Sequence, residues 1–282
     1  MQITESLKNV ARYLLIYRND PIFALSGAGL SSESGIPTFR GQKDGLWNKF
    51  NPSELATFEA FDRDPLTVWK WYLWRMHLIA KAKPNQAHIS LVNLENLLPN
   101  FWHITQNVDG LHRLAGQKRY LELHGNIWEG KCRYCNAFYP EGEFKKLFPL
   151  ADREFLKKLS KEQFEREILK GLDYENLPKC KTCGGVVGPG VVWFGEPLPE
   201  DVLSKAFEIA QSSKVCFSVG TSAVVYPAAY LPELCKKRGG ILVEINPEET
   251  PLTPIADFSF RTSAAEVLPK LVNLLKEELK NS

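Results

Sequence analysis

Apolar residues along this chain fall into short continuous runs that alternate with longer segments of helical spacing. The runs are typical of short strands and occur at 22–25, 101–105, 120–125, 214–219 and 240–245. Helical spacing covers 1–18, 52–83, 87–98, 201–211, 228–238 and 264–280. Because strands and helices alternate after residue 210, the pattern predicts a parallel sheet with right-handed crossovers, which is an α/β fold.

A glycine- and serine-rich segment follows the first strand, from Ser26 to Arg40. A strand that ends in Gly-x-Gly suits a phosphate cradle, because glycines let the backbone approach an anion. The segment departs from the usual dinucleotide fingerprint, since Gly35 comes six positions after Gly29 instead of three. We interpret it as the first loop of a Rossmann-type sheet. The alternative is an ordinary surface loop.

Polar residues follow the later strands as well, at the ends where open α/β sheets bind ligands. They are Gln106, Asn107 and Asp109 after the second strand, His124 in the third, and Gly220, Thr221, Ser222 and Asn246 farther on. An imidazole titrates near neutral pH, so His124 is a candidate general base. The alternatives are an Asx turn at Asp109, ordinary strand-to-loop turns, and structural histidines, which we favour for His77, His88 and His103.

Four of the six cysteines form two Cys-x-x-Cys pairs, Cys132 with Cys135 and Cys180 with Cys183. Two such pairs can close a tetrahedron of thiolates around zinc, and four protein ligands leave no open position for catalysis. The pattern therefore predicts one structural zinc ion in a reducing compartment. The alternative is two unrelated redox or core pairs. The charged, helix-prone insert between the pairs, at 142–177, has no role that the sequence assigns.

Two other features bear on substrate binding. Tyr72 and Arg75 share a helix face and could hold a carboxylate by charge-assisted hydrogen bonds, although the residues alone favour a packing helix with a solvated arginine. Val191–Glu196 has the character of an extended segment.

Composition and charge narrow the classes of protein. The 282 residues are 44% hydrophobic, which suffices for a sizeable core in one or two domains. A net charge of +2 gives no bulk electrostatic case for nucleic acid. No apolar run approaches a membrane span, and 1–18 lacks the order of a signal peptide, so we expect a cytoplasmic protein without membrane contact.

The motifs, taken in order, resemble those of the sirtuin family, and specifically of prokaryotic class III members. They are Gly27-Ala28-Gly29-Leu30-Ser31, the segment from Ser34 to Arg40, Thr105 to His112, Leu123-His124-Gly125, the two cysteine pairs, Trp193 to Glu196, and Gly220-Thr221-Ser222. The resemblance implies a large Rossmann-type NAD-binding domain made of 1–40, 84–125 and 188–282. It also implies a small domain in which a helical module, 41–83, joins a zinc-ribbon module, 126–187.

The resemblance further implies the site residues. The catalytic residues would be His124, as the general base, together with Asn107 and Asp109. NAD, as co-substrate, would contact Gly27, Ala28, Gly29, Ser31, Ile36, Phe39, Arg40, Gln106, Asn107, Val108, Asp109, Gly220, Thr221, Ser222, Asn246 and Ala264. The substrate would contact Tyr72, Arg75, Val192, Trp193, Phe194, Gly195 and Glu196, partly as an added strand.

The implied activity is NAD-dependent removal of acyl groups from protein lysines. The acyl oxygen attacks the ribose carbon as nicotinamide leaves, and the acyl group ends on ADP-ribose. The Tyr-x-x-Arg pair resembles the pocket that class III members use for succinyl and malonyl groups, so we expect both deacetylation and removal of these acidic acyl groups. Ser32, where related members often have a smaller residue, departs from the pattern. We expect acyl-lysine proteins as partners, no direct nucleic-acid binding, and a monomer.

Two alternatives remain at this stage. One is mono-ADP-ribosyl transfer to a protein, which uses the same cofactor cleavage with a different acceptor. The other is a non-catalytic zinc and nucleotide-binding module that recruits chromatin or DNA. The low net charge and the presence of His124 argue against the second alternative.

Overall fold

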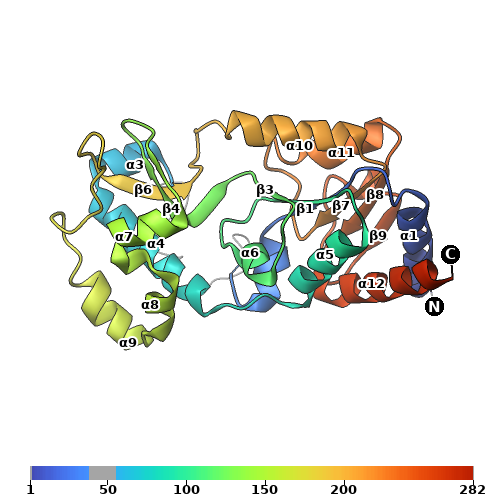
Figure 1. The fold of residues 1–282 in the computed structure, drawn as a ribbon, viewed down its shortest axis with the longest axis horizontal. Helices are drawn as coiled ribbons and strands as arrows, with labels where there is room; N and C mark the ends of the chain where they lie inside the picture. Colours follow the sequence, from blue (N-terminus) through green and yellow to red (C-terminus); the bar gives the residue numbers. More distant parts are fainter. Residues whose placement is uncertain (1, 38–54, 282) are drawn as a thin grey trace.

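The apolar runs found in the sequence form five strands of a six-stranded parallel sheet (Figure 1). The structure, a computed structural model, describes residues 2–37 and 55–281. In spatial order the strands are β3 (Tyr120–Glu122), β2 (Phe101–Thr105), β1 (Ile22–Ser26), β7 (Val215–Val219), β8 (Ile241–Ile245) and β9 (Phe258–Phe260). From β1 the chain adds β2 and β3 toward one edge, and from β7 it adds β8 and β9 toward the other. The boundary between β1 and β7 is therefore the topological switch point, where Rossmann-type sheets bind ligands. The α/β prediction is confirmed.

Helices cover both faces of this sheet, because successive strand residues point to opposite sides. On one face, α1 (Gln2–Ile16), α5 (Gln86–Leu97) and α12 (Ala264–Lys280) share a core with strand residues such as Ala24. On the other, α10 (Glu200–Ser212) and α11 (Tyr230–Lys237) pack with Phe23. None of the helices in the described ranges has both the length and the apolar character of a bilayer span. The two chain ends lie together at the far end of the sheet (Figure 1).

Three short elements of the larger sheet layer carry no clear sequence signal. They are α6 (Leu111–Ala115), the 3-10 turn η5 (Thr253–Ile255) and the edge strand β9. Each has five residues or fewer. Such lengths are too short for a hydrophobic period to identify.

A smaller unit lies beside the sheet (Figure 1). Its three strands are antiparallel, with β4 (Gly125–Cys132) between β5 (Phe138–Tyr139) and β6 (Val187–Val191). Its helices are α3 (Phe58–Arg63), α4 (Pro65–Lys81), α7 (Glu141–Leu147), η3 (Pro149–Ala151), α8 (Arg153–Lys158), α9 (Lys161–Gln163) and the π-helical η4 (Phe164–Leu169). The domain boundary expected at residue 188 falls inside β6.

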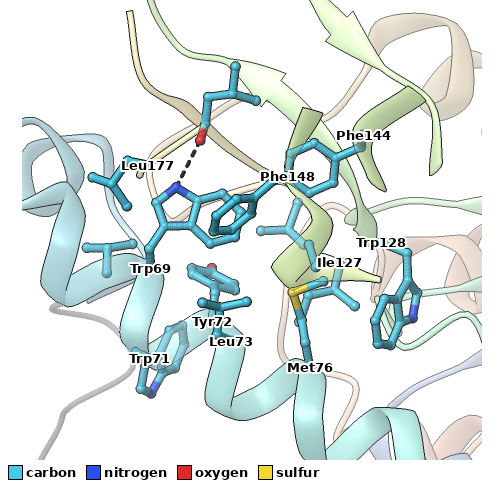
Figure 2. Packing of buried hydrophobic residues seen from close by; sticks show 14 of the residues in the cluster. Trp69, Trp71, Tyr72, Leu73, Met76, Ile127, Trp128, Phe144, Phe148 and Leu177 are labelled. Carbon is cyan, nitrogen blue, oxygen red and sulfur yellow. Dashed lines mark hydrogen bonds between the residues drawn. The ribbon is translucent and has the colours of Figure 1, made fainter. Parts of the chain in front are cut away.

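Helix α4 is the centre of the smaller unit, and aromatic side chains surround it (Figure 2). The Trp69 indole N–H donates to the Val187 carbonyl at 2.9 Å, which ties α4 to β6. The insert between the cysteine pairs packs on the same helix. His77 of α4 stacks on Phe164 with ring centroids 4.3 Å apart, and its Nδ1 lies 3.1 Å from the Leu156 carbonyl oxygen. The insert therefore completes the core that α4 shares with the smaller sheet.

Candidate active site

Three glycines bring the ends of β1 and β7 into backbone contact. The Gly29 N–H donates to the Gly220 carbonyl at 2.8 Å, and the Gly27 N–H donates to the Val219 carbonyl at 3.0 Å. A Cβ on Gly29 would lie 2.7 Å from the Gly220 Cα, so no larger residue fits at this crossing. After it, the chain turns through the 3-10 helix η1 (Ala28–Ser34), which replaces the helix of an ordinary dinucleotide loop.

The next residues of the loop reach the smaller unit. Ile36 and Val108, both expected to contact NAD, are partly buried and pack against the core around α4. Two other residues expected in this loop, Phe39 and Arg40, lie outside the described residues. The β1 and β2 loops thus meet where the sheet and the smaller unit join.

The β2 loop is bonded directly to the glycine loop. The Asn107 Nδ2 donates to the Gly27 carbonyl at 3.0 Å and to the Ser31 hydroxyl at 3.2 Å. The Ser31 hydroxyl donates to the Asp109 carboxylate at 2.7 Å. The other Asp109 oxygen accepts the Leu111 N–H at 2.8 Å. The Asx turn left open by the sequence is therefore present, and the same carboxylate also joins the two loops.

Other residues that the family resemblance implies for NAD meet on the other side of the switch point. The Gln106 Nε2 donates to the Thr221 hydroxyl at 3.0 Å, and the Asn246 Nδ2 donates to the Thr221 carbonyl at 2.7 Å. Ser222 follows and is half-buried. Ala264 is the first residue of α12 and is buried in the core beneath the sheet. Hydroxyl and amide groups of this kind suit ribose and phosphate oxygens.

His124 follows β3, and its geometry fixes the ring tautomer. Its Nδ1 lies 3.0 Å from the Gln106 carbonyl oxygen. Because a carbonyl only accepts hydrogen bonds, Nδ1 carries the proton and Nε2 carries the lone pair. Burial lowers the pKa of His124, and the Gln106 hydrogen bond opposes this effect without cancelling it. The ring is therefore neutral near pH 7 and able to accept a proton at Nε2.

The sequence interpretation gave His88 only a structural role, and the structure adds a second contact. Its Nδ1 accepts the Asn85 N–H at 3.3 Å in a capping box that starts α5. Its Nε2 lies 3.4 Å from the Ser31 hydroxyl. Burial lowers the pKa of His88 to about 4, so this ring is neutral. The Asn-x-x-His spacing at the helix start is the signal that could have indicated the cap.

The prediction of an extended segment at Val191–Glu196 is wrong beyond Val192. The strand β6 ends at Val191, and the next residues form a turn in which the Glu196 N–H donates to the Trp193 carbonyl at 3.0 Å. Gly195 supplies the required left-handed conformation, with φ of 85°. Trp193 is 2% exposed and Phe194 is 58% exposed, so consecutive side chains point to opposite sides of the chain.

The pair on α4 lies next to this turn. The Tyr72 hydroxyl accepts the Trp193 indole N–H at 2.8 Å, and burial raises the pKa of Tyr72 to about 12. The Arg75 guanidinium lies 4.9 Å from the Trp71 ring centroid and 5.7 Å from that of Tyr72. Burial lowers the pKa of Arg75, while the negative charge of Asp109 opposes the decrease. Arg75 is therefore within electrostatic reach of the β2 loop.

The four cysteines of the two pairs form one cluster in the smaller unit. Their sulfur atoms all lie within 4.8 Å of one another, and the Cys132–Cys183 and Cys135–Cys180 sulfur distances are 3.5 and 3.6 Å. Zinc–sulfur bonds of about 2.3 Å in a tetrahedron separate the sulfurs by about 3.8 Å. The donor set and spacing thus fit a structural zinc ion.

Comparisons with known proteins agree with this geometry. The family model described as "Sir2 family" matches residues 27–227. A protein of Aquifex aeolicus named "NAD-dependent protein deacylase" is 50% identical over 257 residues, which cover 91% of this chain and 96% of the relative. A Pyrococcus abyssi protein of the same name is 49% identical over 270 residues, covering 96% and 98% of the two chains.

Solved structures show the same relationship. The chain is similar to a structure titled "crystal structure of a Sir2 homolog-NAD complex", with 44% identity and a TM-score of 0.79 over 96% of this chain and 94% of the other. It is also similar to a Sir2 homologue complex with ADP-ribose, at 42% identity and a TM-score of 0.79 over 97% and 98%. With a family model that matches most of its length and relatives at about half identity, the chain belongs to the Sir2 family.

Proposed function

We propose that the protein removes acyl groups from lysine side chains of other proteins, with NAD as the co-substrate that receives the acyl group and releases nicotinamide. The observation that carries this proposal is the position of His124. Its ring, bonded through Nδ1 to the Gln106 carbonyl, lies at the same sheet edge as the Asn107 and Asp109 loop. The curated relatives named "NAD-dependent protein deacylase" support the activity.

Each part of the edge has a role in this proposal. His124 accepts the proton of a ribose hydroxyl through Nε2. Asn107 and Asp109, held by Ser31, orient the nicotinamide end, while Thr221 and Asn246 hold the adenosine half. The smaller unit excludes water from the opposite side, which strengthens charge interactions in the cleft. The substrate backbone lies along Val192–Glu196, where the Phe194 side chain is exposed. We also propose the domain division given by the family resemblance, with a large NAD-binding domain of 1–40, 84–125 and 188–282 and a small domain of 41–83 and 126–187.

An assay with acetyl-lysine peptide tests this function directly. We expect deacylation only in the presence of NAD, and acyl-ADP-ribose as the product found by mass spectrometry. Turnover without NAD would contradict the proposal. Label from NAD that stays on the protein would instead indicate ADP-ribosyl transfer.

We also propose that acidic acyl groups, such as succinyl and malonyl, are substrates. The Tyr72 hydroxyl accepts its hydrogen bond from Trp193, so its own proton can be donated to a carboxylate. Burial keeps this phenol protonated, since its pKa is raised to about 12. Arg75, one turn along α4, adds a planar cation that suits a carboxylate.

The substitution Arg75→Met tests the carboxylate role. We expect kcat/KM for a succinyl-lysine peptide to fall by about 10- to 100-fold, the effect of losing charge-assisted hydrogen bonds. The value for an acetyl-lysine peptide should change by less than about threefold, because it has no carboxylate to bind. Lys81→Met, an exposed residue at the end of the same helix, is the matched control and should alter neither value. Equal losses on both peptides would remove the role.

Two broader properties complete the proposal. Because four thiolates that bind a metal need a reducing environment, we place the protein in the cytoplasm. Because the residues proposed for both halves of the site come from one chain, a monomer suffices for activity.

A further inference from the structure

Arg133 lies inside the first cysteine pair, and its side chain is only 1% exposed. It donates to both oxygens of the Glu196 carboxylate at 2.6 Å. It also donates to the carbonyls of Pro189 at 2.8 Å and Val191 at 2.7 Å. One guanidinium therefore spans the last residues of β6 and the end of the turn that follows it.

The same guanidinium covers the residue at the start of the turn. The Arg133 Cζ lies 3.8 Å from the Trp193 ring centroid, close enough for a cation–π interaction. The Glu196 carboxylate that Arg133 holds accepts the Trp193 N–H at 2.9 Å. The indole N–H in turn donates to Tyr72. A continuous chain of contacts thus runs from the cysteine pair to the phenol on α4.

The chemistry of this position requires an arginine. A planar guanidinium can bond a carboxylate with two donors and two carbonyls with the others, while it stacks on a ring, whereas a lysine ammonium offers one compact set of donors. Without the guanidinium, the Glu196 carboxylate, itself only 20% exposed, would lose its cation in a poorly solvated place. The turn would then lose the contact that fixes the Glu196 side chain and keep only its other bonds, such as the Phe194 N–H to the Ala56 carbonyl.

We propose that Arg133 is a positioning residue for the acyl-lysine substrate, through which the cysteine cluster sets the shape of the 189–196 segment and the direction of the Tyr72 hydroxyl. This inference rests on the proposed function, because it assumes that the substrate lies along Val192–Glu196. Arg133 itself touches no substrate. The cluster would thereby determine substrate affinity as well as the fold of its own module.

A second arginine in the same module, the half-buried Arg153, provides a matched comparison. Arg153 stacks over Trp128 at 4.1 Å and donates to the Asp109 carbonyl at 2.9 Å, so it contacts the β2 loop and not the 189–196 segment. Removing either side chain deletes a guanidinium from the smaller unit. The two substitutions should nevertheless affect different ligands.

The experiment compares Arg133→Met, Arg133→Lys and Arg153→Met in the full chain. For Arg133→Met we expect the KM for an acetyl-lysine peptide, and its Kd by fluorescence anisotropy, to rise by about tenfold or more, as for loss of bonds to a charged group. The KM for NAD should stay within about twofold. Arg153→Met should instead raise the KM for NAD and leave the KM and Kd for the peptide within about twofold. Arg133→Lys should recover only part of the peptide affinity, because it restores the charge without the planar geometry.

Glu196→Gln provides an independent check on the same contact. It should reproduce the peptide effect, and combining it with Arg133→Met should add little, because both changes remove one interaction. Zinc content and melting temperature are measured for every variant.

An equal rise in KM for NAD and peptide, or a loss of zinc and stability with unchanged peptide Kd, would overturn the inference. Should Arg133→Met fail to fold, Arg133→Lys and Glu196→Gln decide the question by the same measurements. The anisotropy measurement needs no turnover, so absence of NAD-dependent activity in the unaltered protein would reject the proposed function separately.

Discussion

At the scale of the residue, His124 differs from the other four histidines in its position just after β3, beside Gln106 at the edge of the sheet. Each of the others has a side-chain or backbone partner that fixes the fold: His77 with Leu156, His88 with Ser31, His103 with Ser26 and His112 with Glu122. His124 has one backbone partner, and that partner sets its tautomer. A half-buried ring with a fixed tautomer and a lowered pKa is what a general base requires near neutral pH.

The pH dependence of kcat/KM should report this base. The pKa of His124 lies below its ordinary value of 6.5 because burial disfavours the charged ring. The neutral form is therefore the main form at pH 7, and activity should fall only as the pH drops through the lowered pKa. We expect an acid limb with its midpoint below 6.5. His124→Ala should remove the limb and lower kcat by about 10²- to 10⁴-fold.

A measurement of folding over the same range separates protonation of the base from unfolding. The pKa values of His88 and His103 are lowered in the folded protein, so the unfolded chain binds protons more readily at these two rings. The free energy of unfolding that they contribute above pH 6.5 is therefore lost as the pH falls toward the lowered values. Circular dichroism should therefore show whether the fold persists at the midpoint. A midpoint above 6.5 with an intact fold would contradict the assignment.

At the scale of the element, long periodic segments were predictable and short irregular ones were not. The helices around 1–18 and 264–280 and the five-residue strands appear where apolar periodicity places them, because burial of one face determines them. The turn after Val191 was missed, since its geometry depends on Gly195 and on a carboxylate held by Arg133. Arg133 and Glu196 are 63 residues apart, and the local sequence carries no signal for such a pair.

The same distinction applies to the candidate site. Residues at strand ends, such as Asn107 and Thr221, could be grouped from the sequence, because parallel strands end at one edge. Their bonds to Ser31 and Gln106 depend on how the loops cross, which no pattern showed. The role of Arg153 beside Asp109 was likewise hidden in a charged insert.

Gly125 joins the His124 strand end to β4, and its substitution tests that junction. Its φ is 73°, and a Cβ there would lie 2.1 Å from the Gly190 carbonyl oxygen. Gly239 also has a positive φ, 84°, but nothing lies within 4 Å of its Cβ position. Gly239→Ala should cost about 1 kcal/mol of unfolding free energy through the left-handed backbone alone. Gly125→Ala should cost at least about 2 kcal/mol more, because β6 must move.

Urea unfolding of both variants measures this difference. Gly125→Ala should also lower activity, because the bond from the Val192 N–H to the His124 carbonyl, 2.9 Å long, spans the same junction. Similar losses of stability in the two variants would show that β6 yields to the added methyl group without cost.

At the scale of the whole molecule, the smaller unit forms one wall of the proposed cleft through its bonds to the β2 loop. The Ile127 N–H donates to the Val108 carbonyl, and the Trp128 indole and Arg153 both donate to the Asp109 carbonyl, all at 2.9 Å. Strand β4 carries two of these donors and ends at Cys132, the first cysteine of the cluster. The cysteine cluster therefore lies at the far end of this wall.

Removal of the metal should affect the packing of the smaller unit much more than that of the six-stranded sheet. The apparent binding free energy of structural zinc, about 10 kcal/mol or more, is comparable to the stability of a whole domain. Without it, we expect the smaller unit to lose its fixed packing, whereas the six-stranded sheet keeps the two cores that its own helices cover. Trp69, Trp128 and Trp193 are buried in the smaller unit, so tryptophan emission should shift to longer wavelength.

Cys180→Ser makes the same change without a chelator, and Cys216→Ser, a buried thiol of β7 outside the cluster, is its matched control. We expect Cys180→Ser to lose zinc, shift its tryptophan emission and lose most of its activity, while Cys216→Ser retains all three properties. Far-ultraviolet circular dichroism should show that Cys180→Ser keeps the helices that pack on the larger sheet. The proposed base and the Asp109 loop belong to that sheet, and only the wall opposite them depends on the metal. Unchanged emission with full activity in the zinc-free protein would therefore show that the β4 bonds hold the cleft without the cluster.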